Sequence, residues 1–152
     1  MAAQAAAGAA FEKDIHHDPK QKPQKVCVLG GGNFGTAMAF LAASKSHSVR
    51  WYCRDATQAA TITSTRRNPR YLSDIELPEG LEATADVAEA LEGADLVISA
   101  LPAQATPHFI EKHRGDIPSH AIFCCTSKGL YLEEGCFLSE AMLRAFQRPQ
   151  TL

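Results

Sequence analysis

The fold of this chain is indicated most clearly by one run of residues, Lys25-Val-Cys-Val-Leu-Gly-Gly-Gly-Asn-Phe-Gly-Thr-Ala37. It opens with an apolar run that is typical of a strand buried on both faces, and an alanine-rich helical pattern follows it. Between the two, Gly30, Gly32 and Gly35 have the spacing G-x-G-x-x-G. Because a strand precedes these glycines and a helix follows them, the stretch predicts a dinucleotide-binding turn.

Each glycine has a separate task in such a turn. Gly30 permits the tight bend, Gly32 has no side chain to keep a pyrophosphate away, and Gly35 lets the helix pack closely on the strand. The N-terminus of the helix then faces the phosphates with free N–H groups. We predict that residues 30–35, Gly31 included, bind the cofactor; a glycine-rich turn that binds nothing is the alternative interpretation.

The remainder of the chain alternates strand patterns with helix patterns. Parallel strands need crossover helices, so the alternation predicts an α/β fold, a Rossmann-type doubly wound parallel sheet that is covered on both faces and incomplete at the C-terminus. The first helix should bury an apolar stripe of Ala37, Met38, Phe40 and Leu41. Further strands are expected at 48–53, 81–84, 94–101 and 120–126, and helices at about 33–46, 56–66, 87–92, 106–114 and 135–146.

Composition and charge restrict the classes of partner. The 152 residues are about the length of one domain, and 45% of them are hydrophobic and 21% charged. The formal net charge of -2 gives no electrostatic reason to expect nucleic acid or an anionic membrane. No apolar stretch approaches the roughly 20 residues of a spanning helix. We therefore predict neither nucleic acid nor a membrane as a partner.

The first 24 residues differ from the rest in composition. Residues 1–24 are alanine-rich and then charged, without the apolar core of a secretion signal, and are predicted to be a flexible leader. The NAD(P)-binding Rossmann domain is expected at residues 25–148. Adjacent polar side chains in such a leader lack the preorganised geometry that a metal needs, so we predict no metal site at Asp14, His16, His17 and Asp18.

The five cysteines include no CxxC pair, which favours a reducing and therefore cytoplasmic compartment. Cys27, Cys53, Cys124 and Cys125 lie in apolar strand-like runs, where a thiol behaves as a small hydrophobic group. Cys124 and Cys125 should point to opposite faces of one strand, which makes a disulfide between them unfavourable.

The residues after the second predicted strand indicate the preferred cofactor. Arg54 stands 19 residues beyond Gly35, where NAD-specific folds usually carry an acidic side chain for the ribose 2′-hydroxyl. An arginine can pair with a 2′-phosphate instead, so we expect NADPH to be accepted at least as well as NADH. Asp55 is interpreted as a helix cap, with the ribose hydroxyl as its alternative partner.

Several further motifs follow the glycine turn in order. Together they resemble the NAD(P)-dependent glycerol-3-phosphate dehydrogenases, most closely the bacterial and plant-plastid branch. The resemblance spans about Lys25 to Phe146. The motifs are Gly30-Gly-Gly-Asn-Phe-Gly-Thr-Ala37, Trp51-x-x-Arg54-Asp55, Leu77-Pro78 with Ala83-Thr84-x-Asp86, Leu101-Pro-Ala-Gln104 and Ser127-Lys-Gly-Leu130.

The resemblance implies roles for individual residues. Asn33 and Phe34 match cofactor-contacting positions, and a place in the core is the alternative for Phe34. Pro102, at the carboxyl end of the fourth strand, is implied to form a wall of the nicotinamide pocket; a plain strand terminator is the alternative. Lys128 matches a lysine that touches both cofactor and substrate, and is the residue expected to take part in the chemistry.

The resemblance also implies an activity, the hydride transfer with NADP or NAD that interconverts dihydroxyacetone phosphate and sn-glycerol 3-phosphate. In similar enzymes the lysine that acts as general acid/base belongs to a helical domain that this sequence lacks, so the chain alone is expected to be inactive. A homodimeric full-length enzyme and a plastid location are further implications. The alternatives are another two-domain reductase, of the 6-phosphogluconate or ketopantoate type, and a non-catalytic dinucleotide-binding module.

Overall fold

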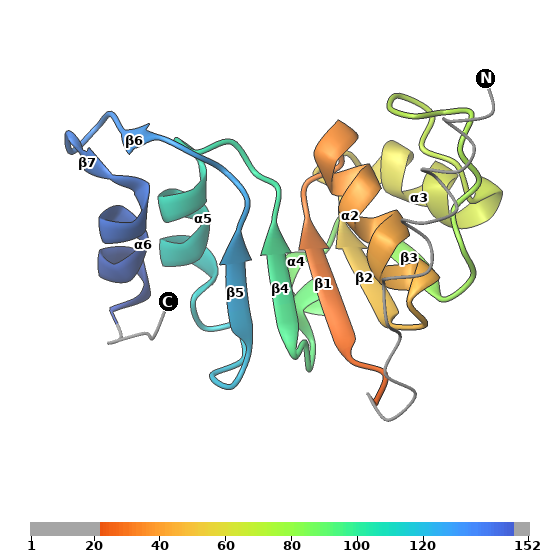
Figure 1. Cartoon of the computed structure of the whole chain (residues 1–152), viewed down its shortest axis with the longest axis horizontal. Coiled ribbons are helices and arrows are strands. Elements are labelled where there is room, and N and C mark those ends of the chain that lie inside the picture. The colour runs from red at the N-terminus through yellow and green to blue at the C-terminus, as the bar shows by residue number, and fades with distance from the viewer. Residues whose placement is uncertain (1–21, 148–152) are drawn as a thin grey trace, which may run out of the picture.

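The computed structural model describes residues 22–147 and contains one sheet of five parallel strands (Figure 1). The strand order is β3-β2-β1-β4-β5, so β1 pairs with β2 on one side and with β4 on the other. This is the predicted doubly wound α/β arrangement, and the direction of winding reverses beside β1. The strands are β1 (Lys25–Leu29), β2 (Ser48–Tyr52), β3 (Leu81–Thr84), β4 (Leu96–Ser99) and β5 (Ile122–Cys125).

Two predictions for the start of the chain fall outside the described residues. Most of the predicted leader, residues 1–21, lies there, as do residues 148–152. The same is true of the four side chains considered as metal ligands, Asp14, His16, His17 and Asp18. Within residues 22–147, no helix combines the length and the apolar character needed to cross a membrane.

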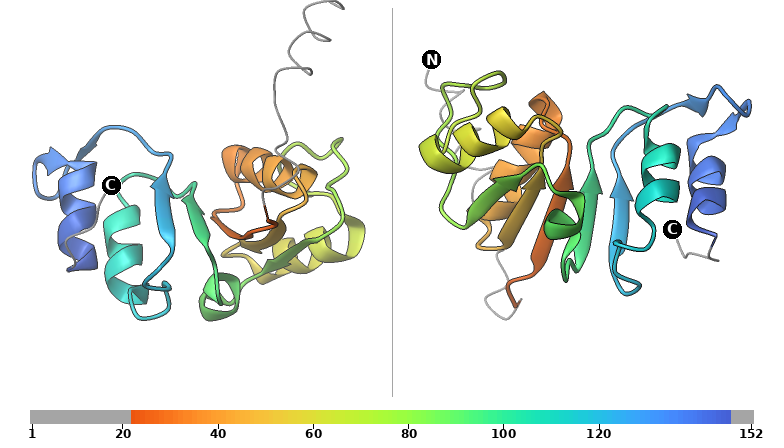
Figure 2. Two further views of the ribbon diagram at one scale, coloured as in Figure 1. Left: turned by 60° about the horizontal axis from the view of Figure 1, so that its bottom comes forward. Right: turned by 180° about the vertical axis from the view of Figure 1, so that it is seen from behind.

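Helices pack on both faces of the sheet (Figure 2). On one face, α2 and α3 pack over β1 and β2 around the fully buried Trp51 and Ile62. On the other face, α4, α5 and α6 enclose a second core around Val97 and Ile110. The helices are α2 (Asn33–Ser44), α3 (Ala56–Thr65), α4 (Val87–Leu91), α5 (Thr106–His113) and α6 (Leu138–Phe146).

The face of α2 that packs against the sheet consists of small residues and not of large ones. Phe40 and Leu41 are exposed, so the predicted apolar stripe is wrong at these two positions. Small side chains let the helix axis approach β1 closely, and a large side chain on this face would hold it away. The buried residues of α2 are Gly35, Thr36, Ala39, Ala42 and Ala43.

A hairpin precedes the last helix, which therefore begins later than predicted. β6 (Leu130–Tyr131) pairs antiparallel with β7 (Cys136–Phe137), and α6 begins at Leu138. The hairpin carries Phe137 to the surface, where it is 63% exposed, although its sequence position suggested the apolar face of the helix. Strands of two residues are too short to produce a periodic signal, so the sequence pattern did not indicate them.

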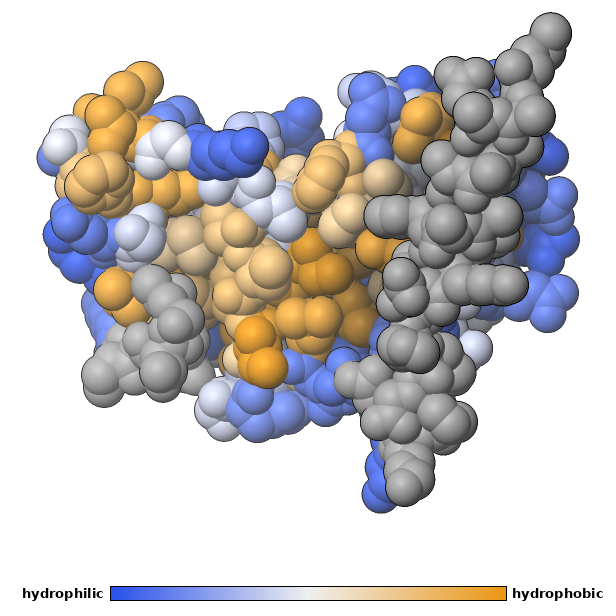
Figure 3. Space-filling view, in the orientation of Figure 1, coloured by the Kyte–Doolittle hydropathy of each residue, from blue (hydrophilic) through white to orange (hydrophobic). Residues whose placement is uncertain are grey.

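Among residues 22–147, no helix covers one face of β5. Phe123 and Cys125 pack against the core under α5 and α6, whereas Ile122 and Cys124 on the opposite face are exposed. The expectation of a sheet covered on both faces is wrong at this face among the described residues. Cys124, which was expected to behave as a small hydrophobic group in an apolar run, is exposed. The prediction that the two cysteines point to opposite faces is confirmed. Apolar residues accordingly gather on the surface over β4 and β5 (Figure 3).

Candidate functional site

A crevice opens at the carboxyl ends of β1, β2 and β4, the edge at which open α/β sheets bind ligands. Its volume is about 500 Å³, within the range of small-molecule sites. We call this cavity the central crevice. Its lining residues are Gly30, Gly31, Gly32, Tyr52, Arg54, Asp55, Gln58, Arg70, Tyr71, Ala100, Leu101, Pro102, Ala105 and Phe109.

The glycine turn has the close approaches that only glycine allows. Gly30 has φ +112°, and a Cβ there would lie 2.9 Å from the carbonyl oxygen of Ala100. A Cβ on Gly35 would lie 1.8 Å from the carbonyl oxygen of Gly30, so no side chain fits where α2 crosses β1. Around Gly32 the space is open, with no atom within 4 Å of the added Cβ. The turn therefore has the shape needed for a phosphate group against its backbone.

Buried side chains hold the three carbonyl groups of residues 30–32 on the inner side of the turn. In a trans peptide unit the N–H points opposite to the C=O, so the N–H groups of residues 31–33 point away from these side chains. The first turn of α2 adds N–H groups without intrahelical acceptors, and no side chain caps them. The bonds are Trp51 Nε1 to Gly30 O, Gln58 Nε2 to Gly31 O and Thr36 Oγ1 to Gly32 O, each 2.8 Å long.

Asp55 caps helix α3, as predicted from the sequence. Its carboxylate accepts hydrogen bonds from the backbone N–H groups of Thr57 at 2.9 Å and Gln58 at 3.2 Å. Arg70 Nη2 lies 2.5 Å from the second oxygen of the carboxylate. The N–H of Gln58 above all, and then Arg70, hold the pKa of Asp55 below its ordinary value against the opposing effect of desolvation. Both carboxylate oxygens are thus occupied within the protein.

Two arginines line the central crevice near the end of β2. Arg54 was predicted, and it is exposed on the crevice wall. Arg70 was not predicted, because it belongs to the loop between α3 and β3, which carries no periodic pattern. The loop is polar and has no period, so no signal in the sequence distinguishes Arg70 from its neighbours. The fold brings this loop back beside β2.

The remaining predicted cofactor residues take different positions. Pro102 lines the central crevice. Asn33 and Phe34 begin α2 at the mouth of the turn, and Phe34 is 53% exposed, so its alternative placement in the core is wrong. Lys128 is exposed in the loop between β5 and β6 and is not among the residues that line the crevice.

Hydrogen bonds tie the loop of Lys128 to the end of β4. Ser127 Oγ donates to the carbonyl of Leu101 at 2.5 Å. Gln104 Nε2 donates to the carbonyl of Leu130 at 2.8 Å, and its Oε1 accepts from the N–H of Leu132 at 2.9 Å. Leu101 itself lines the central crevice. The lysine therefore starts from a loop anchored next to the crevice, with its own side chain unpaired among the described residues.

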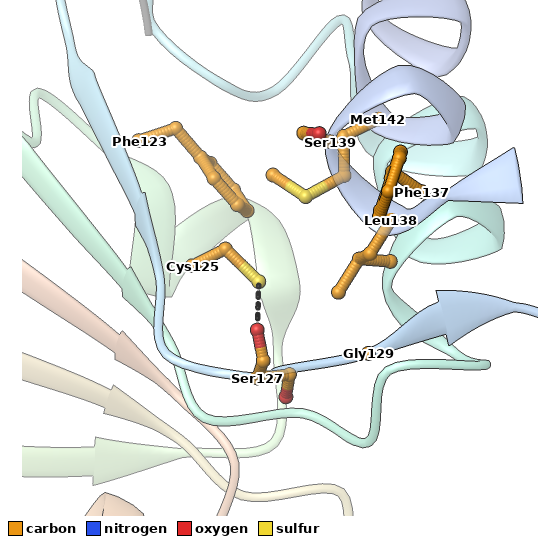
Figure 4. A pocket seen from close by; sticks show the side chains of 8 residues that line it. All are labelled: Phe123, Cys125, Ser127, Gly129, Phe137, Leu138, Ser139 and Met142. Carbon is orange, nitrogen blue, oxygen red and sulfur yellow. Dashed lines mark hydrogen bonds between the residues drawn. The ribbon is translucent and has the colours of Figure 1, made fainter.

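A second cavity of about 390 Å³ lies between the end of β5, the hairpin and α6 (Figure 4). Its walls are mainly apolar, and Cys125 Sγ points toward the carbonyl oxygen of Ser127 at 3.9 Å. No group of three or more potential metal ligands occurs in the described part of the chain. The residues that line this second cavity are Phe123, Cys125, Ser127, Gly129, Phe137, Leu138, Ser139 and Met142.

Comparisons with known proteins agree with this geometry. Residues 25–152 match the family model for the N-terminus of NAD-dependent glycerol-3-phosphate dehydrogenase. The glycerol-3-phosphate dehydrogenase (NAD(P)+) of Alcanivorax borkumensis is 38% identical over 122 residues, which are 80% of this chain and 36% of that protein. The enzyme of the same name from Brucella canis is 40% identical over 118 residues, 78% of this chain and 36% of that protein. The chain thus spans little more than a third of the length of these relatives.

Solved structures give the same result. The crystal structure of glycerol-3-phosphate dehydrogenase from Coxiella burnetii superposes with a TM-score of 0.75 and 25% identity, over 83% of this chain and 38% of that one. The enzyme from Saccharomyces cerevisiae superposes with a TM-score of 0.72 and 25% identity, over 83% of this chain and 40% of that one. Octopine dehydrogenase, at 24% identity and a TM-score of 0.59, shares the fold. By sequence and by structure, this chain belongs to the family of NAD-dependent glycerol-3-phosphate dehydrogenases, whose N-terminal part it matches.

Proposed function

We propose that this chain forms the cofactor-binding part of an NAD(P)-dependent glycerol-3-phosphate dehydrogenase that interconverts dihydroxyacetone phosphate and sn-glycerol 3-phosphate. One observation carries the proposal: side chains bind the carbonyls of residues 30–32, so the following N–H groups point away from those side chains, and the turn lines a crevice of suitable volume. Such a turn at a helix N-terminus is a site for a pyrophosphate. The family match favours this reaction over those of the 6-phosphogluconate and ketopantoate types.

Each part of the dinucleotide has a counterpart in this proposal. The turn binds the pyrophosphate, and Arg54 binds the 2′-phosphate of NADPH at the end of β2. Pro102, with Asn33 and Phe34 across the mouth of the turn, borders the nicotinamide. The bound cofactor supplies the hydride, and the residues of this chain position it and exclude water.

Lys128 is the proposed contact with the substrate. Its exposed ammonium group has no partner among the described residues, so no ion pair has to break before it binds an anion. A cation in this loop can attract the phosphate of dihydroxyacetone phosphate and stabilise negative charge that develops on the carbonyl oxygen. The anchored neighbours Ser127 and Leu130 limit the movement of the loop.

The compartment and the assembly belong to the same proposal. We expect the protein in the cytoplasm, where a reducing environment keeps thiols free, and a plastid is the alternative. The five cysteines are free, which supports a reducing compartment. A homodimer is proposed for the longer enzyme. Microscopy of a tagged protein in its native cell and sedimentation of the longer enzyme test these two points.

A titration of the purified chain with NADPH and NADH, followed by nicotinamide fluorescence, tests the proposal. We expect both cofactors to bind, NADPH at least as well as NADH. We also expect no turnover of dihydroxyacetone phosphate, because positioning of both reactants contributes up to roughly 7 to 11 kcal/mol and the chain spans 36% of its relatives' length. Failure to bind either cofactor would refute the proposal. Turnover near the rate of intact enzymes would refute the expectation that this chain binds the cofactor without catalysing the reaction alone.

A further inference from the structure

Asn68 is a fully buried polar residue in the loop between α3 and β3, 0% exposed. An amide side chain can donate two hydrogen bonds and accept two, and burial makes each missing bond costly. Asn68 makes all four. Its Nδ2 donates to Gly31 O at 3.2 Å and to Thr36 Oγ1 at 2.9 Å, and its Oδ1 accepts from Gln58 Nε2 at 3.0 Å and from the N–H of Arg70 at 3.1 Å.

These four bonds connect two parts of the central crevice. Two of the partners, Gly31 and Thr36, belong to the glycine turn and the first turn of α2. A third, Arg70, also lines the crevice but belongs to the loop between α3 and β3. The carbonyl of Gly31 receives two donors, from Gln58 at 2.8 Å and from Asn68 at 3.2 Å, so both its lone pairs are occupied on the inner side. A peptide unit held in this way cannot rotate without leaving buried polar atoms unpaired.

We infer that Asn68 is a positioning residue for cofactor binding: it fixes the Gly31–Gly32 peptide with its N–H toward the crevice and holds the segment of Arg70 beside it. The inference rests on the proposed function. Asn68 does not line the crevice, so it acts through the turn and through Arg70. Because the pyrophosphate is common to both cofactors, removal of the Asn68 side chain should weaken the binding of NADPH and of NADH together. Arg54→Ala, by contrast, should affect only NADPH.

A merely structural role would show as loss of stability alone, so the test needs a destabilised control. Ile62→Ala supplies one, because Ile62 is fully buried in α3 and belongs to the apolar core. Asn68→Ala removes all four bonds. Thr36→Val is nearly isosteric and removes the hydroxyl that accepts from Asn68 and donates to Gly32 O, so it tests the same network if Asn68→Ala does not fold.

The experiment measures the Kd of NADPH and of NADH for the four folded chains, at a temperature well below each melting point. The ¹³C chemical shift of the Gly31 carbonyl, which reports its hydrogen bonding, is recorded without nucleotide. We expect Asn68→Ala to weaken both nucleotides by about tenfold or more and to shift the Gly31 signal. Thr36→Val should weaken both to a smaller extent. Ile62→Ala should bind as the wild type does once folded.

Three results would contradict the positioning role of Asn68. Wild-type affinity in Asn68→Ala, or in Thr36→Val where Asn68→Ala does not fold, would overturn the positioning role. Equal loss in Ile62→Ala would also overturn it, because stability alone would then explain the effect. If the wild-type chain binds neither nucleotide, the proposed function fails, and only the chemical shift of the Gly31 carbonyl then tests the inference. An unchanged shift in Asn68→Ala, or in Thr36→Val where Asn68→Ala does not fold, would overturn the inference.

Discussion

The side chain of Arg54 lies at the carboxyl end of β2, on the wall of the central crevice, and is unpaired among the described residues. Asp55, the acidic alternative for the ribose, has both oxygens occupied by the α3 cap and Arg70. We therefore propose that the choice between NADPH and NADH depends on Arg54. The acidic neighbour has no free oxygen to compete for the 2′-hydroxyl.

We predict that Arg54→Ala weakens NADPH by about tenfold or more and leaves NADH nearly unchanged. A charge-assisted bond to a phosphate contributes about 1.5 to 3 kcal/mol, and NADH lacks that phosphate. Fluorescence titration with both cofactors measures the difference. Arg67→Ala is the matched control, since Arg67 bonds to Ser73 O and Asp74 O away from the crevice. An equal loss for both cofactors in Arg54→Ala would refute the assignment.

Lys128 should matter for the substrate and not for folding. In a longer enzyme that carries this sequence, we expect Lys128→Ala to change the free energy of unfolding by about 0.5 kcal/mol or less, as for an ordinary surface site. The same variant should lower kcat/KM sharply, because the proposed contact with the substrate is lost. Thermal melting and steady-state kinetics measure the two effects. A large loss of stability with normal turnover would show that the lysine is structural.

Helix α3 depends on the cap that Asp55 provides. Asp55→Ala leaves the N–H groups of Thr57 and Gln58 without their acceptor, and we expect the melting temperature at pH 7 to fall by about 2 to 5 °C. Asp55→Asn is the control, because asparagine caps helices about as well as aspartate. A melting temperature unchanged in the alanine variant would contradict the cap.

The same cap gives stability a pH dependence. Because the pKa of Asp55 in the folded chain lies below its ordinary value of 3.8, its stabilisation is complete above that value and disappears as the pH falls through the folded pKa. Asp55→Asn has no carboxylate to protonate. Its stability should therefore decline less steeply than that of the wild type as the pH falls below about 4, as measured by urea unfolding.

For the molecule as a whole, the face of β5 that no helix of residues 22–147 covers predicts self-association. Ile122 is 69% exposed on the same face as the exposed Cys124, and β5 is an outer strand of the sheet. Apolar faces next to an unpaired strand edge favour contact between copies. We expect Ile122→Lys to shift the chain toward the monomer in sedimentation velocity over a range of concentrations. An identical distribution of species for both chains would contradict this expectation.

The order of the helices and of the five strands of the parallel sheet can be read from the sequence alone, as can the glycine turn. The requirements of the turn are local: Gly35 is needed because a Cβ would meet Gly30 O at 1.8 Å, and these residues are close in the chain. The cap at Asp55 is local too, with both N–H partners within three residues. Residues that interact over such short separations leave a recognisable spacing in the sequence. The fold class and this part of the candidate site could therefore be predicted.

The residues beneath the turn, and the faces of the sheet that stay exposed, follow from contacts between distant segments of the chain. Asn68 bonds to Gly31 and Thr36, which are 37 and 32 positions away, so its role exists only once β1, α2 and the loop after α3 are assembled. Arg70 reaches the crevice through the same loop. The apolar pattern of β5 predicts a strand, but it does not tell which face receives a helix. Hydrogen bonds between distant segments, and the choice of the sheet face that a helix covers, depend on tertiary packing. No periodic pattern in the sequence reports such packing.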